Sequence, residues 1–318
     1  RVTVDNNSLS PPTISGFFHI FFLGPFIFDM SVNKRNYSLL GLLVLMWGSS
    51  FLLIDRSLLF FSPEQVVGYR LFIGAITMML VAFFYGKKFP KSITPWLHFI
   101  VYAVIGNILP YLLIAKGQVT ITSGMAGLLM AIMPLVTLVL AHFFLPNDKL
   151  NRYKAFGFVI GISGVLFILS PSLRDGSNTL IGILLVLSAA CAYGVNTIIA
   201  SRLPSYDPIV SSACVLLIAS TLSFFIWPGV FFIDFSGVPL LSGASLILLG
   251  ILPTGLAALV YFIIINSAGA TFLSNINYLI PVVAFFLGAL LLGEDILLSN
   301  LLALVLIISG IFVSRFKS

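Results

Sequence analysis

Long apolar stretches alternate with short polar connections along most of this chain. Ten of these stretches can be distinguished, and most reach the ~18 residues needed for a membrane-spanning helix. They lie at about 37–54, 65–85, 95–115, 121–145, 153–170, 179–201, 208–229, 242–265, 271–292 and 297–315. A transmembrane β-barrel would instead show segments of about ten residues with alternating polarity. The pattern therefore predicts an all-α integral membrane protein with ten transmembrane helices.

The first 36 residues do not fit this pattern. Residues 17–28 are apolar, but they are too few to span a bilayer and are interrupted by Gly24-Pro25. The segment from Met30 to Arg35 is short and basic and directly precedes the first long apolar stretch. We interpret residues 1–36 as an N-terminal extension and cytoplasmic start, and we expect residues 1–29 to be dispensable.

Composition supports the membrane interpretation. Hydrophobic residues make up 59% of the chain and charged residues only 8%, whereas soluble domains carry about 25% charged residues. The net charge of +6 could indicate nucleic-acid binding, but the basic residues lie mostly in short connections between apolar segments. Cys191 and Cys214 lie within apolar segments and show no metal-ligand spacing. We therefore expect a lipid bilayer as the environment, with no nucleic acid, metal or cofactor.

The distribution of lysine and arginine predicts the orientation. If the N-terminus is cytoplasmic, eleven basic residues fall on the cytoplasmic side and four on the other side. The eleven are Lys34, Arg35, Lys87, Lys88, Lys91, Lys149, Arg152, Lys154, Arg202, Arg315 and Lys317, and the four are Arg56, Arg70, Lys116 and Arg174. Positive charge accumulates on the cytoplasmic side of membrane proteins. We therefore expect a multi-pass protein of the cytoplasmic membrane with both termini in the cytoplasm.

Short motifs recur at a nearly constant offset of 146 or 147 residues. The pairs are Met46-Trp47-Gly48 with Ala192-Tyr193-Gly194, Ala131 to Val136 with Tyr278 to Val283, Asn147-Asp148 with Glu294-Asp295, and Ser163-Gly164-Val165 with Ser309-Gly310-Ile311. The chain thus divides into two repeats, 37–170 and 179–315, each with five helices. An odd number of crossings makes the second repeat enter from the opposite side. Inverted repeats are typical of secondary transporters that bind substrate near the midplane.

The same residues carry a family resemblance that covers nearly all of 37–315. The chain resembles the EamA-type branch of the drug/metabolite transporter superfamily. The motifs are Trp47 to Phe51, Tyr69 to Phe72, the helix containing Pro134, and Pro281 through Glu294 followed by Ser309-Gly310-Ile311. The chain departs from the family where Asn147-Asp148 replaces a frequent glutamate. The resemblance implies a permease or exporter of amino acids or other small metabolites.

Polar side chains at helical spacing are the candidate substrate contacts, because they are costly to expose to lipid. Asn277, Tyr278 and Pro281 share one helix face, and Pro281 frees a carbonyl near residue 277. Other pairs that share a face are Asn107 with Tyr111, Tyr193 with Asn196, Thr254 with Tyr261, and Trp47 with Ser50. We predict a midplane cavity with Asn277 and Tyr278 opposite Asn107 and Tyr111, to which Trp47, Tyr193, Asn196 and Tyr261 also contribute. The alternative is packing between helices or an interfacial belt.

Four further residues are assigned gating or structural roles. Arg70 is expected to form an ion pair with Glu64 or Asp55, with an anion-attracting mouth as the alternative. Pro134 and Pro281 interrupt their helices, and Glu294 is expected to fix the turn that follows it. In addition, Gly157 and Gly161 form a GxxxG motif, which indicates close helix approach within the monomer or in a homodimer.

No aspartate or glutamate falls in the middle of any predicted helix. This absence favours neutral or zwitterionic small-molecule substrates over organic cations. We therefore predict a secondary transporter working by alternating access, with no catalytic residues. The alternatives are a channel and a membrane-embedded enzyme, but no nucleophile and base are paired by spacing, and an inverted duplication favours a carrier.

Overall fold

The protein is entirely helical wherever it is described. A computed structural model describes residues 34–145, 150–175, 178–232, 237–273 and 275–316. Across those ranges no β-strand occurs, so the all-α prediction is confirmed. The N-terminal extension up to residue 33, the Asn147-Asp148 turn and Lys317 lie outside the described residues.

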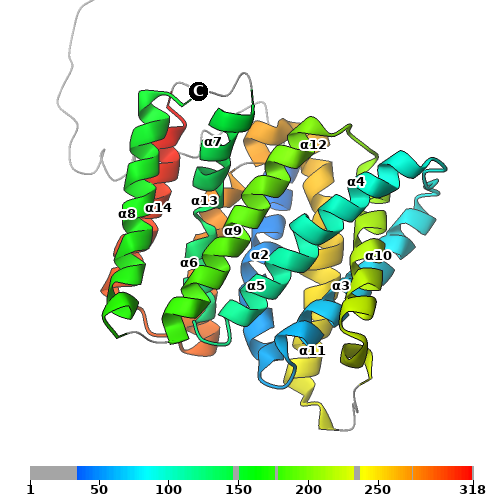
Figure 1. Cartoon of the computed structure of the whole chain (residues 1–318), viewed down its shortest axis with the longest axis horizontal. Coiled ribbons are helices and arrows are strands. Elements are labelled where there is room, and N and C mark those ends of the chain that lie inside the picture. The colour runs from blue at the N-terminus through cyan, green and yellow to red at the C-terminus, as the bar shows by residue number, and fades with distance from the viewer. Residues whose placement is uncertain (1–33, 146–149, 176–177, 233–236, 274, 317–318) are drawn as a thin grey trace, which may run out of the picture.

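The helices run roughly along one direction and form a bundle that is elongated across it (Figure 1). In chain order they are α2 (Lys34–Leu58), α3 (Pro63–Phe84), α4 (Ile93–Ala103), η1 (Val104–Ile108), α5 (Leu109–Gly117), α6 (Ser123–Met130), α7 (Met133–Phe144), α8 (Arg152–Asp175), α9 (Asn178–Arg202), α10 (Pro208–Ile226), η2 (Pro228–Phe231), α11 (Leu240–Leu249), η4 (Gly250–Leu256), α12 (Ala257–Leu273), α13 (Ile276–Leu287), η5 (Gly288–Leu292) and α14 (Leu298–Ser314). The elements η1, η4 and η5 are π-helical, and η2 is a 3₁₀ turn.

Eight helical segments of the described chain are long and apolar enough to cross a membrane, judged by length and composition. They are Lys34–Leu58, Pro63–Phe84, Ile93–Gly117, Ser123–Phe144, Arg152–Leu169, Thr179–Arg202, Pro208–Ile226 and Leu240–Tyr261. Two further apolar segments, Ile276–Leu292 and Leu298–Ser314, are shorter. The first of these begins later than the predicted residue 271, because α12 continues to Leu273, and it ends where Gly293 adopts the left-handed region at φ 70°.

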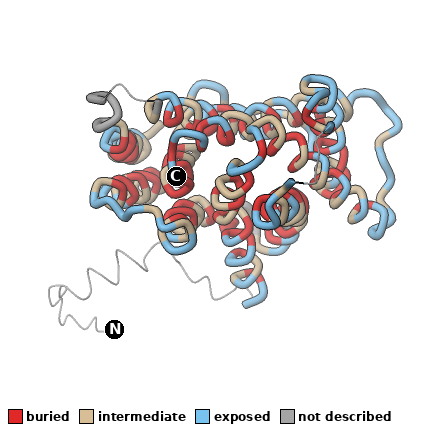
Figure 2. The backbone as a smooth tube through the Cα atoms, turned by 90° about the horizontal axis from the view of Figure 1, so that it is seen from below, coloured by how far each residue is buried: buried red, intermediate tan, exposed pale blue. Residues whose placement is uncertain are grey.

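The outer surface of the bundle is apolar. Side chains such as Phe83, Phe225 and Leu240 are 77%, 73% and 87% exposed, and exposed residues follow the outward faces of the helices in Figure 2. In water, burying such apolar surface stabilises a protein by about 25 cal/mol per Å2. A soluble protein therefore rarely exposes large contiguous apolar patches. Only acyl chains cover this outer surface without cost, and the chain is therefore a multi-pass membrane protein.

Helices α8 and α14 form an intimate antiparallel pair at one end of the bundle (Figure 1). A Cβ on Gly157 would clash with the Gly310 carbonyl, and a Cβ on Gly164 would lie 3.0 Å from the Ala303 carbonyl. Residue numbers thus increase along α8 where they decrease along α14, so the two helices are antiparallel. The glycines let the two backbones touch, as in other small-residue interfaces of membrane helices. The GxxxG motif beginning at Gly157 is therefore used within the monomer.

Helices α3 and α10 pack against each other at the opposite end of the bundle, also antiparallel. Lys87, just after α3, donates to Asp207, which caps the start of α10, at 2.6 Å. Burial alone would raise the pKa of Asp207, but the Lys87 hydrogen bond and the amides of Val210 and Ile209 outweigh it and lower that pKa. The end of α3 and the start of α10 thus share one side of the molecule.

The repeated motifs contact each other reciprocally across the two halves. A Cβ on Gly48 would lie 2.6 Å from Val283 Cγ1, and a Cβ on Gly194 would lie 2.8 Å from Val136 Cγ1. Gly48 and Gly194 are 146 residues apart, and Val136 and Val283 are 147 apart. The glycine of each half therefore packs against the equivalent valine of the other half. The repeat in the sequence is thus also a repeat in the packing.

Candidate functional site

A cluster of polar and aromatic side chains surrounds the buried arginine of α3. Arg70 is 5% exposed, and its Nε donates to Thr254 Oγ1 at 2.9 Å. The Tyr111 ring lies flat against the guanidinium, 3.6 Å from ring centroid to Cζ. A charged side chain at the centre of a membrane helix costs at least about 2.5–3.5 kcal/mol on insertion scales, and Arg70 lies in the first half of α3. Arg70 is thus held by one hydrogen bond and one cation–π contact rather than by an opposite charge.

The ion pair expected for Arg70 does not form among the described side chains. Glu64 instead pairs with Lys116 at 3.0 Å, and no described carboxylate lies within 4 Å of Arg70. The physical reason is helical geometry. Six positions on a helix correspond to about 600° of rotation, so Glu64 and Arg70 face different directions. Lys116 at the end of α5 takes the place expected for Arg70.

Two π-helical segments occupy equivalent positions in the two halves and border this cluster. Segment η1 begins at Val104 and η4 at Gly250, 146 residues apart. In each, a polar side chain donates to the carbonyl five residues earlier. Asn107 Nδ2 donates to Tyr102 at 3.0 Å, and Thr254 Oγ1 donates to Leu249 at 2.7 Å. Such π-bulges often mark functional sites in membrane and soluble helices.

Pro253 explains the distortion in η4. It has no amide hydrogen, so the Leu249 carbonyl four residues earlier lacks its helical donor. The Thr254 hydroxyl supplies that donor while it accepts from Arg70. The carbonyl of Pro253 itself accepts from Trp47 Nε1 at 3.1 Å. Sequence spacing identifies Thr254 as a polar residue near Tyr261, but only the structure places it against Arg70.

Trp47 and Tyr261 form an aromatic wall beside η4. Their ring centroids are 5.9 Å apart with planes inclined by 44°. Because Trp47 also binds the Pro253 carbonyl, this wall directly adjoins Thr254, the hydrogen-bond partner of Arg70. The structure therefore links Trp47, Tyr111 and Tyr261 from the predicted substrate-binding set to Arg70.

Tyr193 and Asn196 of α9 approach the same region from the other side. Tyr193 interacts electrostatically with Tyr111 and Arg70. Asn196 packs onto Gly106 of η1, where an added Cβ would lie 2.8 Å from its Nδ2, and its buried Oδ1 has no hydrogen-bond partner in the described chain. Asn107 is the next residue after Gly106. Tyr193 and Asn196 therefore extend the cluster along α9 toward η1, whereas the Asn107 side chain donates to the Tyr102 carbonyl of its own helix.

Asn277 and Tyr278 take part in none of these contacts. Tyr278 is 6% exposed, and its ring lies under Arg315, with 4.6 Å between Cζ and the ring centroid. Arg315 immediately follows α14, so this stacking ties α13 to the C-terminal end of the bundle. The structure thus does not bring Tyr278 to Tyr111. Pro281 lies inside α13, whereas Pro134 occupies the first turn of α7 after a break in the helix.

Glu294 contacts the N-terminus of a helix from the other half. Its Oε1 accepts from Ser123 N at 2.7 Å and its Oε2 from Gly124 N at 2.9 Å. Both amides lie in the first turn of α6, where backbone donors are unsatisfied and negative charge is favourable. Glu294 thus joins the two halves in addition to following its own turn, which sequence spacing did not indicate.

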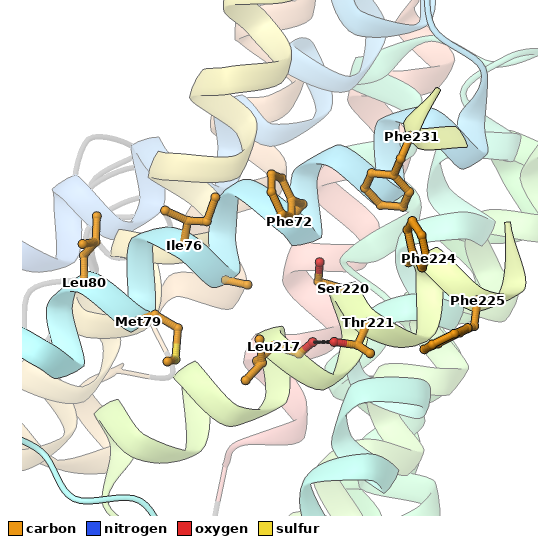
Figure 3. A pocket seen from close by; sticks show the side chains of 11 residues that line it. Phe72, Ile76, Met79, Leu80, Leu217, Ser220, Thr221, Phe224, Phe225 and Phe231 are labelled. Atoms are coloured by element: carbon orange, nitrogen blue, oxygen red, sulfur yellow. Dashed lines mark hydrogen bonds between the residues drawn. The ribbon is translucent and has the colours of Figure 1, made fainter. Parts of the chain in front are cut away.

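Two hollows in the described surface are apolar and include none of the predicted contacts. One has a volume of about 640 Å3 and lies between α3 and α10. Figure 3 shows Phe72, Phe224 and Phe231 at its rim, while the Thr221 hydroxyl donates to the Leu217 carbonyl of its own helix at 2.8 Å. The other, of about 390 Å3, lies among α7, α8 and α9. Lipid chains are the natural filling of such surfaces.

The polar groups of the central cluster determine what it can bind. No three histidine, cysteine, aspartate or glutamate side chains of the described residues gather as a metal site. The central cluster instead offers hydrogen-bond donors, aromatic faces and one cation. These groups suit reversible binding of a small polar molecule, and an apolar helical bundle with a buried polar cluster between its halves defines the class of membrane transporters.

Comparison with known proteins identifies the family. The model of the EamA-like transporter family matches residues 35–170 and again 180–316. The chain therefore belongs to the EamA-like transporter family.

Similar proteins carry transporter names. The chain is 29% identical over 279 residues to "Uncharacterized transporter YoaV" of Bacillus subtilis (strain 168), a match covering 86% of this chain and 94% of that protein. It is 25% identical over 281 residues to "Uncharacterized inner membrane transporter YedA" of Escherichia coli (strain K12), covering 85% and 87%. A crystal structure with 19% identity superposes with a TM-score of 0.62 over 89% of this chain and 97% of the other, which shows a shared fold.

Proposed function

We propose that this protein is a secondary transporter of small neutral or zwitterionic metabolites, amino acids among them, and that it works by alternating access. In this proposal ten helices cross the cytoplasmic membrane as two inverted five-helix repeats, 37–170 and 179–315, with both termini in the cytoplasm. Family membership supports transport as the activity. The inverted arrangement and the substrate class are inferred from contacts within the chain.

The antiparallel helix pairs support the inversion. Helices α3 and α10 begin 145 residues apart, at Pro63 and Pro208, and α8 and α14 begin 146 apart, at Arg152 and Leu298. Equivalent helices related by an axis along the membrane normal would run parallel. Here each equivalent pair runs antiparallel, as the Lys87–Asp207 ion pair requires for the first. An axis in the membrane plane produces that relation.

The polar cluster between the two halves is the observation that carries the proposal. Arg70 and Tyr111 come from the first repeat, whereas their neighbours Thr254 and Tyr193 come from the second. A site built from both halves changes its exposure when one half moves against the other. Alternating access requires this coupling between substrate binding and the movement of the two halves.

Solute counterflow in proteoliposomes tests the function. We expect saturable uptake of a ¹⁴C-labelled L-amino-acid mixture that accelerates when the vesicles are preloaded with the unlabelled mixture. Acceleration by solute on the opposite side of the membrane is specific to carriers, because a carrier returns faster with substrate bound. A channel has no such return step. Non-saturable flux without acceleration would indicate a channel, and chemical conversion of the label would indicate an enzyme. Either result contradicts the proposal.

Two substitutions test whether Asn277 and Tyr278 contact substrate together with the α5–α9 residues. For Asn277→Ala and Tyr278→Phe we expect normal membrane abundance with reduced flux, since a wet cavity loses little stability when one polar group is removed. Loss of a helix–helix hydrogen bond would instead lower stability by about 0.6 kcal/mol. Normal flux in both variants would exclude them from the site and leave the stacking of Arg315 on Tyr278 as a packing contact.

A further inference from the structure

We propose that the Arg70 guanidinium binds the carboxylate of a transported zwitterion, so that the transporter recognises molecules that carry a carboxylate, such as amino acids, and rejects the corresponding amines. The inference rests on the proposed carrier function, because it names the substrate group that this central cluster receives. It extends that function from a general substrate class to one recognising residue. Three features of the cluster support it: the free edge of the guanidinium, the local charge and the adjoining wall.

The guanidinium is held in place with one edge left free. Its Nε is occupied by Thr254, and its face is covered by Tyr111. The two Nη atoms make no hydrogen bond to any described residue. They form a planar fork whose spacing matches the two oxygens of a carboxylate. Thr254 and Tyr111 thus orient the side chain without using the donors that a carboxylate would bind.

The positive charge of Arg70 is not neutralised within the described chain. Glu64 is engaged by Lys116, Asp207 by Lys87, and Glu294 by the amides of α6. Asp55, the other partner expected for Arg70, has Arg56 and Glu294 as its charged neighbours and forms no ion pair with Arg70. Each of these carboxylates serves a contact near the end of a helix, outside the central cluster. A buried charge without a partner is unfavourable, and a carboxylate arriving from solution would relieve that cost. Charge therefore favours an anionic group on the substrate.

The neighbouring wall can receive the remainder of a zwitterion. Trp47 and Tyr261 present aromatic rings beside the Thr254 contact. Aromatic faces attract ammonium groups and also pack against apolar side chains. Because Arg70 belongs to one half and Thr254 to the other, separating the halves releases one of the contacts that bury the guanidinium. Substrate binding and the movement of the halves are thereby linked.

Binding can be measured independently of transport on purified protein in lipid nanodiscs. Three probes share the isobutyl side chain of leucine: L-leucine, 4-methylpentanoate, which lacks the amine, and 3-methylbutylamine, which lacks the carboxylate. We expect the first two, but not the amine, to raise the thermal unfolding temperature in a saturable manner. Stabilisation by the amine as strong as that by leucine would overturn the proposal, as would no stabilisation by either carboxylate.

Substitutions locate the carboxylate. Arg70→Gln removes the charge, and Arg70→Lys keeps the charge but removes the fork. We expect affinity for 4-methylpentanoate to fall by about tenfold or more in both, because a charge-assisted, bidentate contact is lost. Arg56→Gln is the matched control, because Arg56 donates to the Leu291 carbonyl at 3.1 Å, near the end of α2 and outside the central cluster. If Arg70→Gln binds 4-methylpentanoate as tightly as the wild type, Arg70 is a packing residue and the proposal fails.

Flux of the same probes separates this inference from the carrier function. Carboxylate binding that depends on Arg70, without counterflow of either carboxylate, would refute the transporter and leave the anion site standing. Saturable counterflow of leucine that is unchanged in Arg70→Gln would support the transporter and refute the anion site. Arg70-dependent binding together with Arg70-dependent counterflow is the result expected if both are correct.

Discussion

Individual residues show that polar groups in this bundle satisfy one another across the two halves. Glu294 accepts from an amide in the first turn of α6, and Trp47 donates to the Pro253 carbonyl. Thr254 donates to the Leu249 carbonyl and accepts from Arg70. In hydrocarbon each unsatisfied backbone group costs several kcal/mol. Side chains that satisfy such groups therefore fix the relative positions of the helices that carry them.

Removal of Glu294 should destabilise the protein through α6. Glu294→Ala leaves the amides of Ser123 and Gly124 without their acceptor, and we expect a loss of about 0.5–2 kcal/mol, the usual range for a helix cap. The neighbouring Asp295→Ala is the control, because Asp295 is exposed. Thermal unfolding in detergent measures the difference. Equal stability of the two variants would show that the cap contributes nothing.

The same contact predicts a coupling between two substitutions. A Cβ on Gly124 would lie 2.8 Å from Glu294 Oε2, so Gly124→Ala should displace the carboxylate and destabilise the wild type. In the Glu294→Ala background that clash is absent. The double variant should therefore be more stable than the sum of the single effects indicates, because residues in contact are not additive. Strict additivity would contradict the contact.

At the scale of whole elements, glycine decides which helices can pair closely. Gly157 and Gly164 bring α8 against the backbone of α14, while η1 and η4 place equivalent irregular turns beside Arg70. At Gly157 the nearest atoms of α14 are the Gly310 carbonyl and the Ser314 amide nitrogen, both of the backbone. The association of α8 with α14 depends on backbone contact and packing, since lipid provides no hydrophobic force between membrane helices.

Gly157→Ala should weaken the α8–α14 pair. The added Cβ would meet the Gly310 carbonyl and lie 2.6 Å from Ser314 N, and both are backbone atoms that cannot rotate away. We expect a loss of about 1–3 kcal/mol from overpacking. Gly41→Ala is the matched control, because nothing lies within 4 Å of its added Cβ. There helix propensity should make the change neutral or stabilising by about 0.5–1 kcal/mol. Similar unfolding temperatures for both would contradict the packing.

On the scale of the whole molecule, ion pairs connect different helices close to the points where these helices begin or end. Lys87–Asp207 connects the two halves beside α3 and α10, and Lys116–Glu64 closes the opposite end of α3 against α5. Both pairs are partly exposed, so each contributes at most about 1 kcal/mol. Their main effect is on the register of the helices that they join.

The Lys87–Asp207 pair predicts a pH dependence of stability. The pKa of Asp207 is lowered in the folded protein, so its contribution is present above the ordinary aspartate pKa of about 3.9 and is lost as the pH falls through the lowered value. Asp207→Asn should therefore reduce stability at pH 7 by up to about 1 kcal/mol. Below the lowered pKa it should have little effect.

Unfolding of Asp207→Asn and the wild type is compared at pH 7 and at a pH below the lowered pKa of Asp207. Lys87→Gln should reproduce the loss at pH 7, whereas Lys88→Gln, at an exposed neighbouring position, should not. A stability difference between Asp207→Asn and the wild type that is the same at both pH values would show that the charge of Asp207 is irrelevant.

Orientation in the membrane is the remaining prediction at this scale. The Lys87 connection, the start of α10 and the basic segment around Arg152 should face the cytoplasm together with the C-terminus, because positive charge is retained there. Alkaline phosphatase fused to the C-terminus should be inactive, and green fluorescent protein at the same position should fluoresce. Active phosphatase would place the C-terminus outside and reverse the proposed topology.

The sequence by itself determined the helical class, the membrane environment and the internal repeat. Hydrophobic run length and charge position act locally, so both can be read without a partner. The Gly48 and Val136 motifs even indicated which segments are equivalent, although not that each packs against the other half.

Only the tertiary structure decided the partners of the polar residues. Arg70 was expected to meet Glu64, but Lys116 takes that carboxylate and Thr254, 184 positions away, receives Arg70. The Tyr278 ring stacks against Arg315 of the chain segment after α14, a contact that helical spacing did not indicate. Spacing along a helix fixes which side chains share a face, but the helix that covers this face depends on packing over the whole bundle. Contacts between distant segments therefore required the folded chain.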